Sequence, residues 1–157
     1  MKTNLQSILP YIVKAKLQQK KIVLVTGVFD LLHSEHLKFL TKAKHQGDLL
    51  IVGIETDQRV RKIKGPERPI NAQKQRLEGI INTKIADLGF ILPEQFNSPD
   101  DHENLIKTIR PDILAVSSHT KHLEAKRTIL NKYNGVVKVV HQHNPKISTT
   151  KLIAITK

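Results

Sequence analysis

Short apolar runs alternate along the chain with segments in which apolar residues recur at helical spacing. Runs without polar alternation are typical of strands that are covered on both faces. Five such runs occupy residues 22–27, 49–54, 85–92, 112–116 and 136–140. The segments around them predict helices over residues 4–19, 34–46, 56–63, 71–82, 99–110 and 121–133, and a last helix after Ser148.

Local signals indicate where several of these helices begin and end. Gly47 is a typical residue just after a helix, and Asn71 and Ser148 are typical N-caps. Pro99 followed by two aspartates is a common helix start. Pro10 should interrupt or restart the first helix, because proline lacks the backbone N–H of a helix interior.

Strands that alternate with helices predict a parallel sheet with helices on both faces. We therefore expect one α/β domain over residues 1–157, a Rossmann-like three-layer α/β/α sandwich around a five-stranded parallel sheet. Residues 1–20 would add a helical segment at its N-terminal end, a candidate dimer contact. Ligands of such sheets bind beyond the carboxyl ends of the strands. The loops after residues 27, 54, 116 and 140 are therefore the places to search.

Composition removes several classes of function. The chain has 157 residues, 39% of them hydrophobic, which suits one domain with a real core. The absence of cysteine excludes disulfides, thiolate zinc sites and a cysteine nucleophile. The N-terminal stretch has no continuous apolar core of a signal peptide, and no run is long enough to span a membrane. We therefore expect no membrane partner and a cytoplasmic location.

The formal net charge of +12 indicates an anionic partner or a lysine-rich solvated surface. Only 4% of residues are aromatic and tryptophan is absent, which is a poor composition for stacking exposed bases. Nucleic acid is therefore not the expected partner. Phosphorylated small molecules explain the charge equally well.

The segment GVFDLLHSEH, residues 27–36, follows the first strand directly. His33 and His36 are three residues apart at a helix start, where free backbone N–H groups and the positive end of the helix dipole favour phosphate. Two imidazoles there could donate hydrogen bonds to a phosphoryl group during transfer. In isolation, the same spacing would often be two ordinary surface histidines.

Two further segments carry groups that suit phosphate. ISTTK, residues 147–151, offers the hydroxyls of Ser148, Thr149 and Thr150 at another helix start, although Ser148 alone would be an ordinary N-cap. The basic stretch of residues 56–71 is broken by Gly-Pro and Arg-Pro, which places its charges on a loop that could close over phosphates. Its candidates, with one from the next helix, are Lys62, Lys64, Arg68 and Arg76.

GVFDLLHSEH resembles the GxFDxxHxGH signature of the cytidylyltransferase-like nucleotidyltransferases, which include glycerol-3-phosphate cytidylyltransferase and the adenylyltransferase domain of ADP-heptose synthase. The similarity extends over residues 22–151, and ISTTK resembles the family's C-terminal signature. KIKGPERPIN is similar to the ADP-heptose synthase type and favours ATP, whereas ISTTK fits the cytidylyltransferase type equally well. Both ATP and CTP therefore stay open.

The resemblance implies transfer of a nucleotide from ATP or CTP to a sugar phosphate or polyol phosphate, with release of pyrophosphate. It implies catalytic roles for His33, His36, Lys62 and Lys64, and an acceptor or phosphate contact for Arg68, which Arg76 would join. Mg²⁺ would travel with the nucleotide, and Asp30 would contact it or orient a histidine. Nucleotide-binding roles fall to Gly27, Val28, Phe29, Asp30, Ser148, Thr149 and Thr150.

Three positions depart from the family pattern, all of them in the expected nucleotide pocket. Glu35 stands where the signature has glycine, and its carboxylate brings negative charge to a place meant for phosphate. Two like charges roughly 4 Å apart repel each other by about 1 kcal/mol in water and about 4 kcal/mol at an intermediate dielectric. SSHT, with Ser117 and His119, replaces a glycine-rich segment that has an acidic residue. His143 lies near the place of an arginine. An alternative hypothesis is therefore a catalytically impaired homologue that binds a nucleotide or a partner without turnover.

The histidines also allow a metal hypothesis, since three pairs lie in loops on the same expected edge of the sheet: His33 with His36, His119 with His122, and His141 with His143. Neutral imidazoles bind zinc and nickel well. Without a cysteine or an evident carboxylate ligand, adventitious binding is the preferred interpretation of these histidines.

Overall fold

The computed structural model describes residues 4–156, and its centre is a sheet of five parallel strands in the order β3-β2-β1-β4-β5. The strands are β1 (Ile22–Gly27), β2 (Leu49–Ile54), β3 (Leu88–Ile91), β4 (Ile113–Ser117) and β5 (Val136–His141). The helices are α1 (Leu5–Leu17), α2 (Ser34–Lys44), α3 (Asp57–Lys64), α4 (Gln73–Asn82), α5 (Pro99–Ile109), α6 (Leu123–Lys132) and α7 (Thr149–Thr156).

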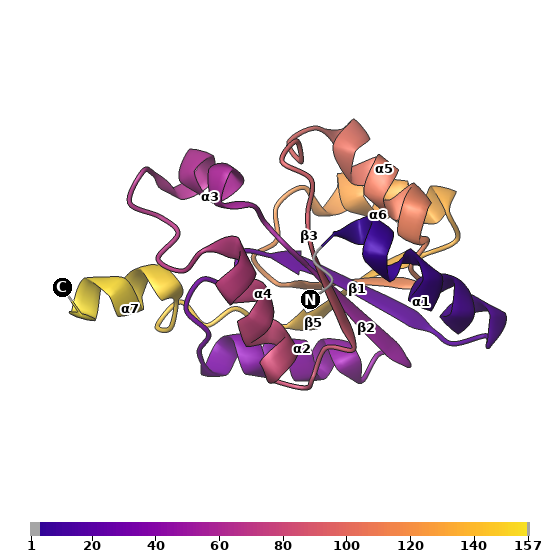
Figure 1. The fold of residues 1–157 in the computed structure, drawn as a ribbon, viewed down its shortest axis with the longest axis horizontal. Coiled ribbons are helices and arrows are strands. Elements are labelled where there is room, and N and C mark those ends of the chain that lie inside the picture. The colour runs from indigo at the N-terminus through magenta and orange to yellow at the C-terminus, as the bar shows by residue number, and fades with distance from the viewer. Residues whose placement is uncertain (1–3, 157) are drawn as a thin grey trace.

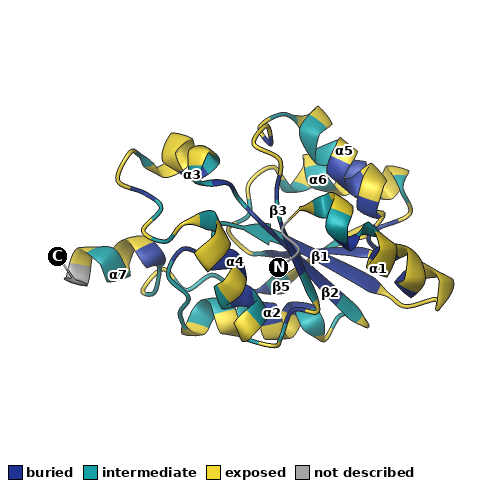
Figure 2. Ribbon diagram, viewed as in Figure 1, coloured by how far each residue is buried: buried dark blue, intermediate teal, exposed yellow. Residues whose placement is uncertain are grey.

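Helices cover both faces of the sheet and confirm the three-layer Rossmann-like sandwich (Figure 1). On one face, α1, α5 and α6 pack on alternate strand residues such as Leu24 and Leu114. On the other face, α2 and α4 pack on the intervening residues, among them Val25 and Ala115. β1, β2 and β4 are the most deeply buried part of the chain, and the helices turn exposed faces outward (Figure 2).

The strand predictions were accurate for β1 and β2, whose bounds match the apolar runs. β3 is shorter than residues 85–92, because it pairs with β2 only over four residues. β4 and β5 each extend one residue further than expected. β5 is an edge strand with exposed valines, so it is less buried than its apolar sequence suggested.

Pro10 does not interrupt α1, which runs unbroken over 13 residues, so this prediction was wrong. The proline removes the bond to the carbonyl of Gln6 four residues earlier, but both residues are exposed and water can serve that carbonyl. α1 buries Ile8, Ile12 and Ala15 against the core. This burial outweighs the loss of one hydrogen bond. Whether α1 also serves a dimer stays a prediction.

The predicted N-cap at Asn71 was also wrong, since the cap position of α4 is Ala72. The Asn71 side chain instead donates to the carbonyl of Asp30 at 2.8 Å, and its backbone N–H donates to the Asp30 carboxylate at 2.9 Å. Ser148, by contrast, accepts from the Lys151 N–H and caps α7 as expected. Asn71 is therefore used to attach a loop rather than to start a helix.

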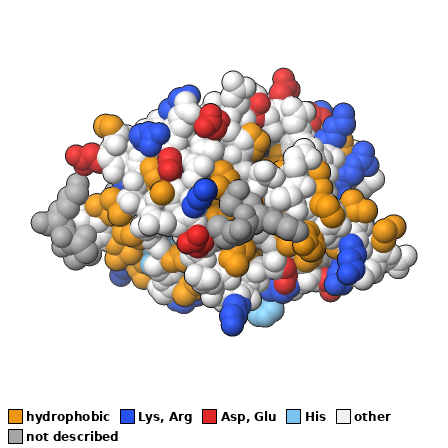
Figure 3. All heavy atoms as spheres, in the orientation of Figure 1, with side chains coloured by type: hydrophobic (Ala, Val, Ile, Leu, Met, Phe, Trp, Pro, Cys, Tyr) orange, Lys and Arg blue, Asp and Glu red, His pale blue; other side chains and the backbone are white. Residues whose placement is uncertain are grey.

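Charged side chains of both signs are interspersed over the face of the molecule in Figure 3, and among the described residues this face shows no continuous basic track. None of the helices between residues 4 and 156 has the length and apolar character that crossing a membrane requires.

Candidate active site

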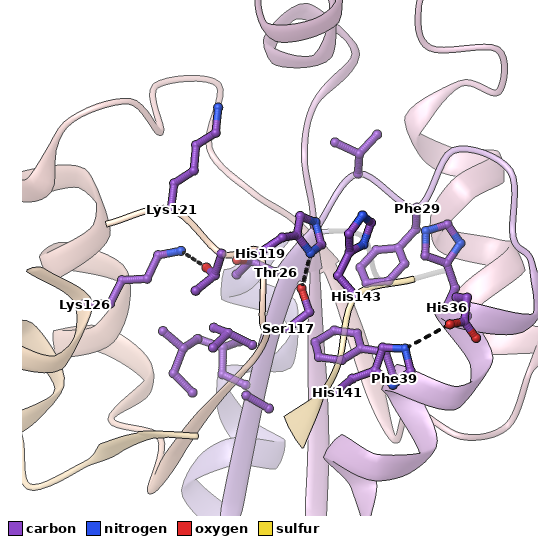
Figure 4. A pocket seen from close by; sticks show the side chains of 18 of the residues that line it. Thr26, Phe29, His36, Phe39, Ser117, His119, Lys121, Lys126, His141 and His143 are labelled. Carbon is purple, nitrogen blue, oxygen red and sulfur yellow. Dashed lines mark hydrogen bonds and ion pairs between the residues drawn. The ribbon is translucent and has the colours of Figure 1, made fainter. Parts of the chain in front are cut away.

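A cleft of about 450 Å³ opens where β1, β4 and β5 end. This is where the strand order reverses direction, since β2 lies on one side of β1 and β4 on the other. One wall consists of residues 27–29 and the start of α2, and the opposite wall of the segment after β4 and the start of α6 (Figure 4). The loop after β5 and the start of α7 complete it. Three of the four loops expected from the sequence thus border one cavity.

His33 is the N-cap of α2 through its imidazole ring. Its Nδ1 accepts from the backbone N–H groups of Glu35 and His36, at 3.2 and 3.4 Å. Because Nδ1 accepts, the ring proton sits on Nε2, which leaves that N–H as a donor. The rings of His33 and His36 stack with centroids 3.7 Å apart, and Phe29 meets the His36 ring edge-on. Both predicted histidines therefore line the cleft on one side of the helix start.

Both histidines are neutral at pH 7. Burial lowers the pKa of His36 to about 4, helped by the neighbouring His33 and Lys64 and opposed by the carbonyl of Leu31. Burial also lowers the pKa of His33, although Glu35 raises it. The pair therefore presents neutral imidazoles to the cleft rather than two fixed positive charges.

The low pKa of His36 predicts a loss of stability in mild acid. The unfolded chain binds a proton at this residue near its ordinary pKa of 6.5 and the folded chain only near 4, so the unfolded state gains more from a fall in pH. The free energy of unfolding should fall by about 2–3 kcal/mol for this group between pH 6.5 and 4. Urea unfolding across this range checks it. His36→Phe should show a shallower pH dependence, and an unchanged slope would contradict this origin.

Asp30 attaches the basic loop of residues 65–71 to the first strand's end. Its side chain is 0% exposed and accepts from Arg68 Nε at 3.0 Å and from the backbone N–H groups of Ile70 and Asn71. Burial raises the pKa of Asp30, but the two N–H groups and Arg68 together lower it by more. The pKa is therefore below its ordinary value, and the carboxylate is ionised. Both of its oxygens are occupied, and neither holds a histidine. Asp30 therefore does not fit the expected magnesium or histidine contact.

Arg76 does not face a phosphate, contrary to expectation. Its side chain is 0% exposed and donates to the carbonyls of Val28 and Asn71 and to the carboxylate of Asp57. Every nitrogen of the guanidinium is thereby used. We therefore assign Arg76 a structural role: its buried side chain supports the backbone at Val28, which borders the cleft.

The start of α7 brings the three predicted hydroxyls to the same cleft as the histidines. The Thr149 hydroxyl lies 3.4 Å from the carbonyl of Leu31, which joins α7 to the segment before α2. Thr150 accepts from Arg68 Nη1 at 3.3 Å. The two helix starts that the sequence singled out therefore converge on one cavity.

The basic stretch of residues 56–71 does not place its charges on one loop, contrary to expectation: Lys62 and Lys64 lie on α3, and of these three candidates only Arg68 lies on the loop of residues 65–71. Lys64 borders the cleft from the exposed end of α3, and partial desolvation together with Arg68 lowers its pKa. Arg68 lines an adjoining cavity with Lys64 and Thr150, and its Nη2 is buried without a hydrogen-bond partner among the described residues. Lys62 is exposed on α3 and is not part of the cleft wall. A catalytic contact of Lys62 thus requires a movement of this segment.

The opposite wall contains the other departures from the family pattern. His119 Nδ1 and the Ser117 hydroxyl are hydrogen-bonded at 2.7 Å. The His119 ring lies against that of His143, with centroids 4.0 Å apart (Figure 4). Lys121 and Lys126 were not predicted but line the same wall, and Lys126 donates to the Thr120 hydroxyl at 2.6 Å. Their position just after the fourth strand was the one available signal.

Glu35 points toward β5 rather than standing unpaired before the histidines. Its Oε2 lies 3.3 Å from Lys38 Nζ, and its Oε1 lies 3.5 Å from Nε2 of His141. Burial raises the pKa of Glu35, but Lys38 and His141 lower it below its ordinary value. Glu35 is the one carboxylate among the described residues that line the cleft, and the ammonium of Lys38 offsets its charge.

The histidines do not form a metal centre in this arrangement. Within residues 4–156, no group of three or more histidine, aspartate or glutamate side chains is placed to hold a metal ion. His122, part of the metal hypothesis, is exposed at the N-cap of α6 and outside the cleft wall.

Known proteins resemble the chain in sequence and in fold. It is 34% identical over 138 residues to the bifunctional protein HldE of Geobacter sulfurreducens, covering 87% of this chain and 27% of that protein. The HldE of Campylobacter fetus is 35% identical over 134 residues, covering 85% and 27%. The chain thus spans about a quarter of the length of these curated relatives.

A solved lipopolysaccharide core biosynthesis protein of Thermoplasma volcanium matches with a TM-score of 0.63 and 28% identity, covering 80% of this chain and 97% of the other. Pantothenate synthetase of Thermus thermophilus shares the fold with a TM-score of 0.65 at 13% identity, covering 97% and 66%. The model of the family described as cytidylyltransferase-like matches residues 24–155, which include both helix starts of the cleft. The chain therefore belongs to the cytidylyltransferase-like family.

Proposed function

We propose that the chain is a nucleotidyltransferase that moves a nucleoside monophosphate from ATP or CTP to a sugar phosphate or polyol phosphate. One observation carries the proposal: the paired imidazoles of α2 and the hydroxyls of α7 border a single cleft whose lone carboxylate is offset by Lys38. Two helix starts facing one cavity suit a triphosphate better than a single phosphate. Family membership and the HldE relatives support the same class of reaction.

In the proposed reaction, a phosphate oxygen of the acceptor attacks the α-phosphorus in line. The new phosphorus–oxygen bond forms as the bond to the bridging oxygen of pyrophosphate breaks, and no covalent enzyme intermediate is needed. The N–H donors of His33 and His36 and the ammonium of Lys64 stabilise the charge on the α-phosphoryl group. The hydroxyls and backbone N–H groups of residues 148–150 hold the departing pyrophosphate.

Magnesium would be held by the nucleotide rather than by a protein carboxylate. Asp30 has both oxygens occupied, and Glu35 is paired with Lys38 and His141. When bound, Mg²⁺ supplies positive charge to the phosphate oxygens. The protein's own part is to position the reacting groups and to surround them with donors.

Between the two nucleotides, ATP is the preferred donor. The basis is the similarity of KIKGPERPIN to the ADP-heptose synthase type, together with the HldE relatives. CTP remains the alternative, because ISTTK suits both types. A phosphorylated sugar is the corresponding acceptor.

Pyrophosphate release tests the proposal. The protein is incubated with Mg²⁺, each nucleoside triphosphate in turn, and a panel of phosphorylated sugars and polyols. We expect release with ATP and a sugar phosphate, and none when the acceptor is omitted. Absence of release with every pair, from a protein that is folded by circular dichroism, would refute the proposed reaction.

The second candidate is a homologue that binds nucleotide without turnover. It is favoured by Glu35, which lines the cleft at the glycine position of the signature. This candidate predicts that Glu35→Gly creates activity that the unaltered chain lacks. The same assay on both proteins separates the two candidates.

A further inference from the structure

Glu35 and His141 bring the start of α2 into contact with the end of β5, at the side of the cleft. Glu35 is the second residue of α2, and His141 is the last residue of β5. Both side chains are largely buried, with 12% and 8% exposed, and they lie 3.5 Å apart between Oε1 and Nε2. His141 lies beside Phe39, with His36 on the same side of the cleft (Figure 4). The pair is thus a contact between the predicted catalytic helix and the edge strand.

The tautomer of His141 follows from its second partner. Its Nδ1 lies 3.0 Å from Nζ of Lys42, which lies near the other end of α2 from Glu35. A lysine ammonium can only donate, so Nδ1 is the acceptor and the ring proton sits on Nε2, facing Glu35. The ring therefore lies between a donor and an acceptor of the same helix. Only the contact with Lys42 is a hydrogen bond; the contact of Nε2 with Glu35 at 3.5 Å is electrostatic, since Nε2 has no hydrogen-bond partner among the described residues.

The contact extends from α2 to the opposite wall through the backbone. The carbonyl of His141 accepts from the N–H of Ser118, the residue just after β4. Ser118 in turn accepts through its hydroxyl from the N–H of His143. A continuous set of contacts therefore connects the start of α2 with the loops after β4 and β5, on which His119 and His143 lie.

We propose that Glu35 and His141 form a clasp that sets the position of the α2 start, and hence of His33 and His36, relative to the β4 and β5 loops. Glu35 is then a positioning residue. It takes the place of the signature glycine without obstructing the cleft, because its carboxylate turns to His141 and Lys38. The inference rests on the proposed function for its catalytic consequence, but the clasp itself can be observed without substrate.

The first experiment reads the histidine rings directly. Long-range nitrogen–proton spectra of the substrate-free protein should show His141 protonated on Nε2. Glu35→Gly should shift the ring signals of His33 and His36, whereas Glu35→Gln, which keeps a side-chain oxygen beside His141, should leave them nearly unchanged. Glu78→Gly makes the same exchange on an exposed position of α4 and should have no effect on these rings. Unmoved His33 and His36 signals in Glu35→Gly would overturn the clasp.

The second experiment measures turnover in the same four proteins, in His141→Ala and in the double variant Glu35→Gly/His141→Ala. Misplacement of a catalytic group by about 1 Å costs about a hundredfold in rate, so Glu35→Gly should lower kcat by about tenfold to a hundredfold with a smaller change in the KM for nucleotide. Glu35→Gln should stay within about threefold of the unaltered chain, and Glu78→Gly should match it. His141→Ala should resemble Glu35→Gly, and the double variant should be no worse than either single one, because the residues act as one unit.

The opposite result is equally clear. A higher kcat in Glu35→Gly would overturn the clasp and support the impaired homologue. If the unaltered chain releases no pyrophosphate with any pair of substrates, the proposed function fails, and the ring spectra alone then decide whether the clasp exists.

Discussion

Replacement of His36 by phenylalanine is expected to lower kcat for nucleotidyl transfer by about 10²–10³, the range for the loss of one preorganised donor to a developing oxyanion. Phenylalanine preserves an aromatic ring between His33 and Phe29, with which His36 makes a stacked and an edge-on contact. It removes the single ring N–H of the neutral imidazole together with its acceptor nitrogen. The change should therefore act on the chemical step and leave the fold intact. Steady-state release of pyrophosphate gives kcat and the KM for nucleotide.

His122→Asn is the matched control for this variant. His122 is exposed at the same end of the sheet and has a left-handed backbone, which asparagine adopts readily. It should retain full activity. A His36→Phe protein with native thermal unfolding and undiminished kcat would show that the imidazole has no part in catalysis.

Replacement of Asp30 by alanine is expected to lower the free energy of unfolding by about 3–5 kcal/mol, the usual cost of removing one partner of a buried ion pair. The change leaves the Arg68 guanidinium and the N–H groups of Ile70 and Asn71 without their acceptor. The loop of residues 65–71 should then separate from the end of β1. Urea unfolding measures the stability, and limited proteolysis should show faster cleavage within that loop.

Asp100→Ala provides the comparison, because Asp100 is exposed in the first turn of α5 and should cost less than about 1 kcal/mol. Equal losses for the two variants would mean that Asp30 has no special part in attaching the loop. Asp30→Ala should also weaken nucleotide binding, since Arg68 links this loop to Thr150 at the start of α7.

The fold was predictable because its signals are local. Parallel strands buried on both faces leave uninterrupted apolar runs, and β1 and β2 begin and end where such runs do. The two helix starts of the cleft were predictable for a similar reason, since His33 and Ser148 both follow strands. Pro10 shows the limit of local rules. Its effect depends on the burial of Ile8 and Ile12, which the proline itself does not encode.

The use of charged residues was less predictable, because it depends on which distant groups fold against them. Arg76 and Lys64 belong to the same basic region of the sequence, yet one is enclosed by Val28, Asn71 and Asp57 and the other borders the cleft. Glu35 was expected to repel phosphate. Its actual partner, His141, lies 106 residues away in the sequence, so no spacing rule could have revealed the pair.

The hydrophobic clusters on both faces of the sheet extend through the whole domain, but within the sheet few residue pairs join β1, β2 and β3 to β4 and β5. β1 pairs with β2 over six residues but with β4 over only two, Val23 with Ile113 and Leu24 with Leu114. His33 and His36 follow β1, and residues 148–150 follow β5. A molecule held by both helix starts would therefore bridge the boundary between β1 and β4. It would connect two groups of strands that each have their own ladder of hydrogen bonds. If the chain were cleaved within residues 93–97, neither fragment would contain a complete cleft. The cleft would form again only when the two fragments associate.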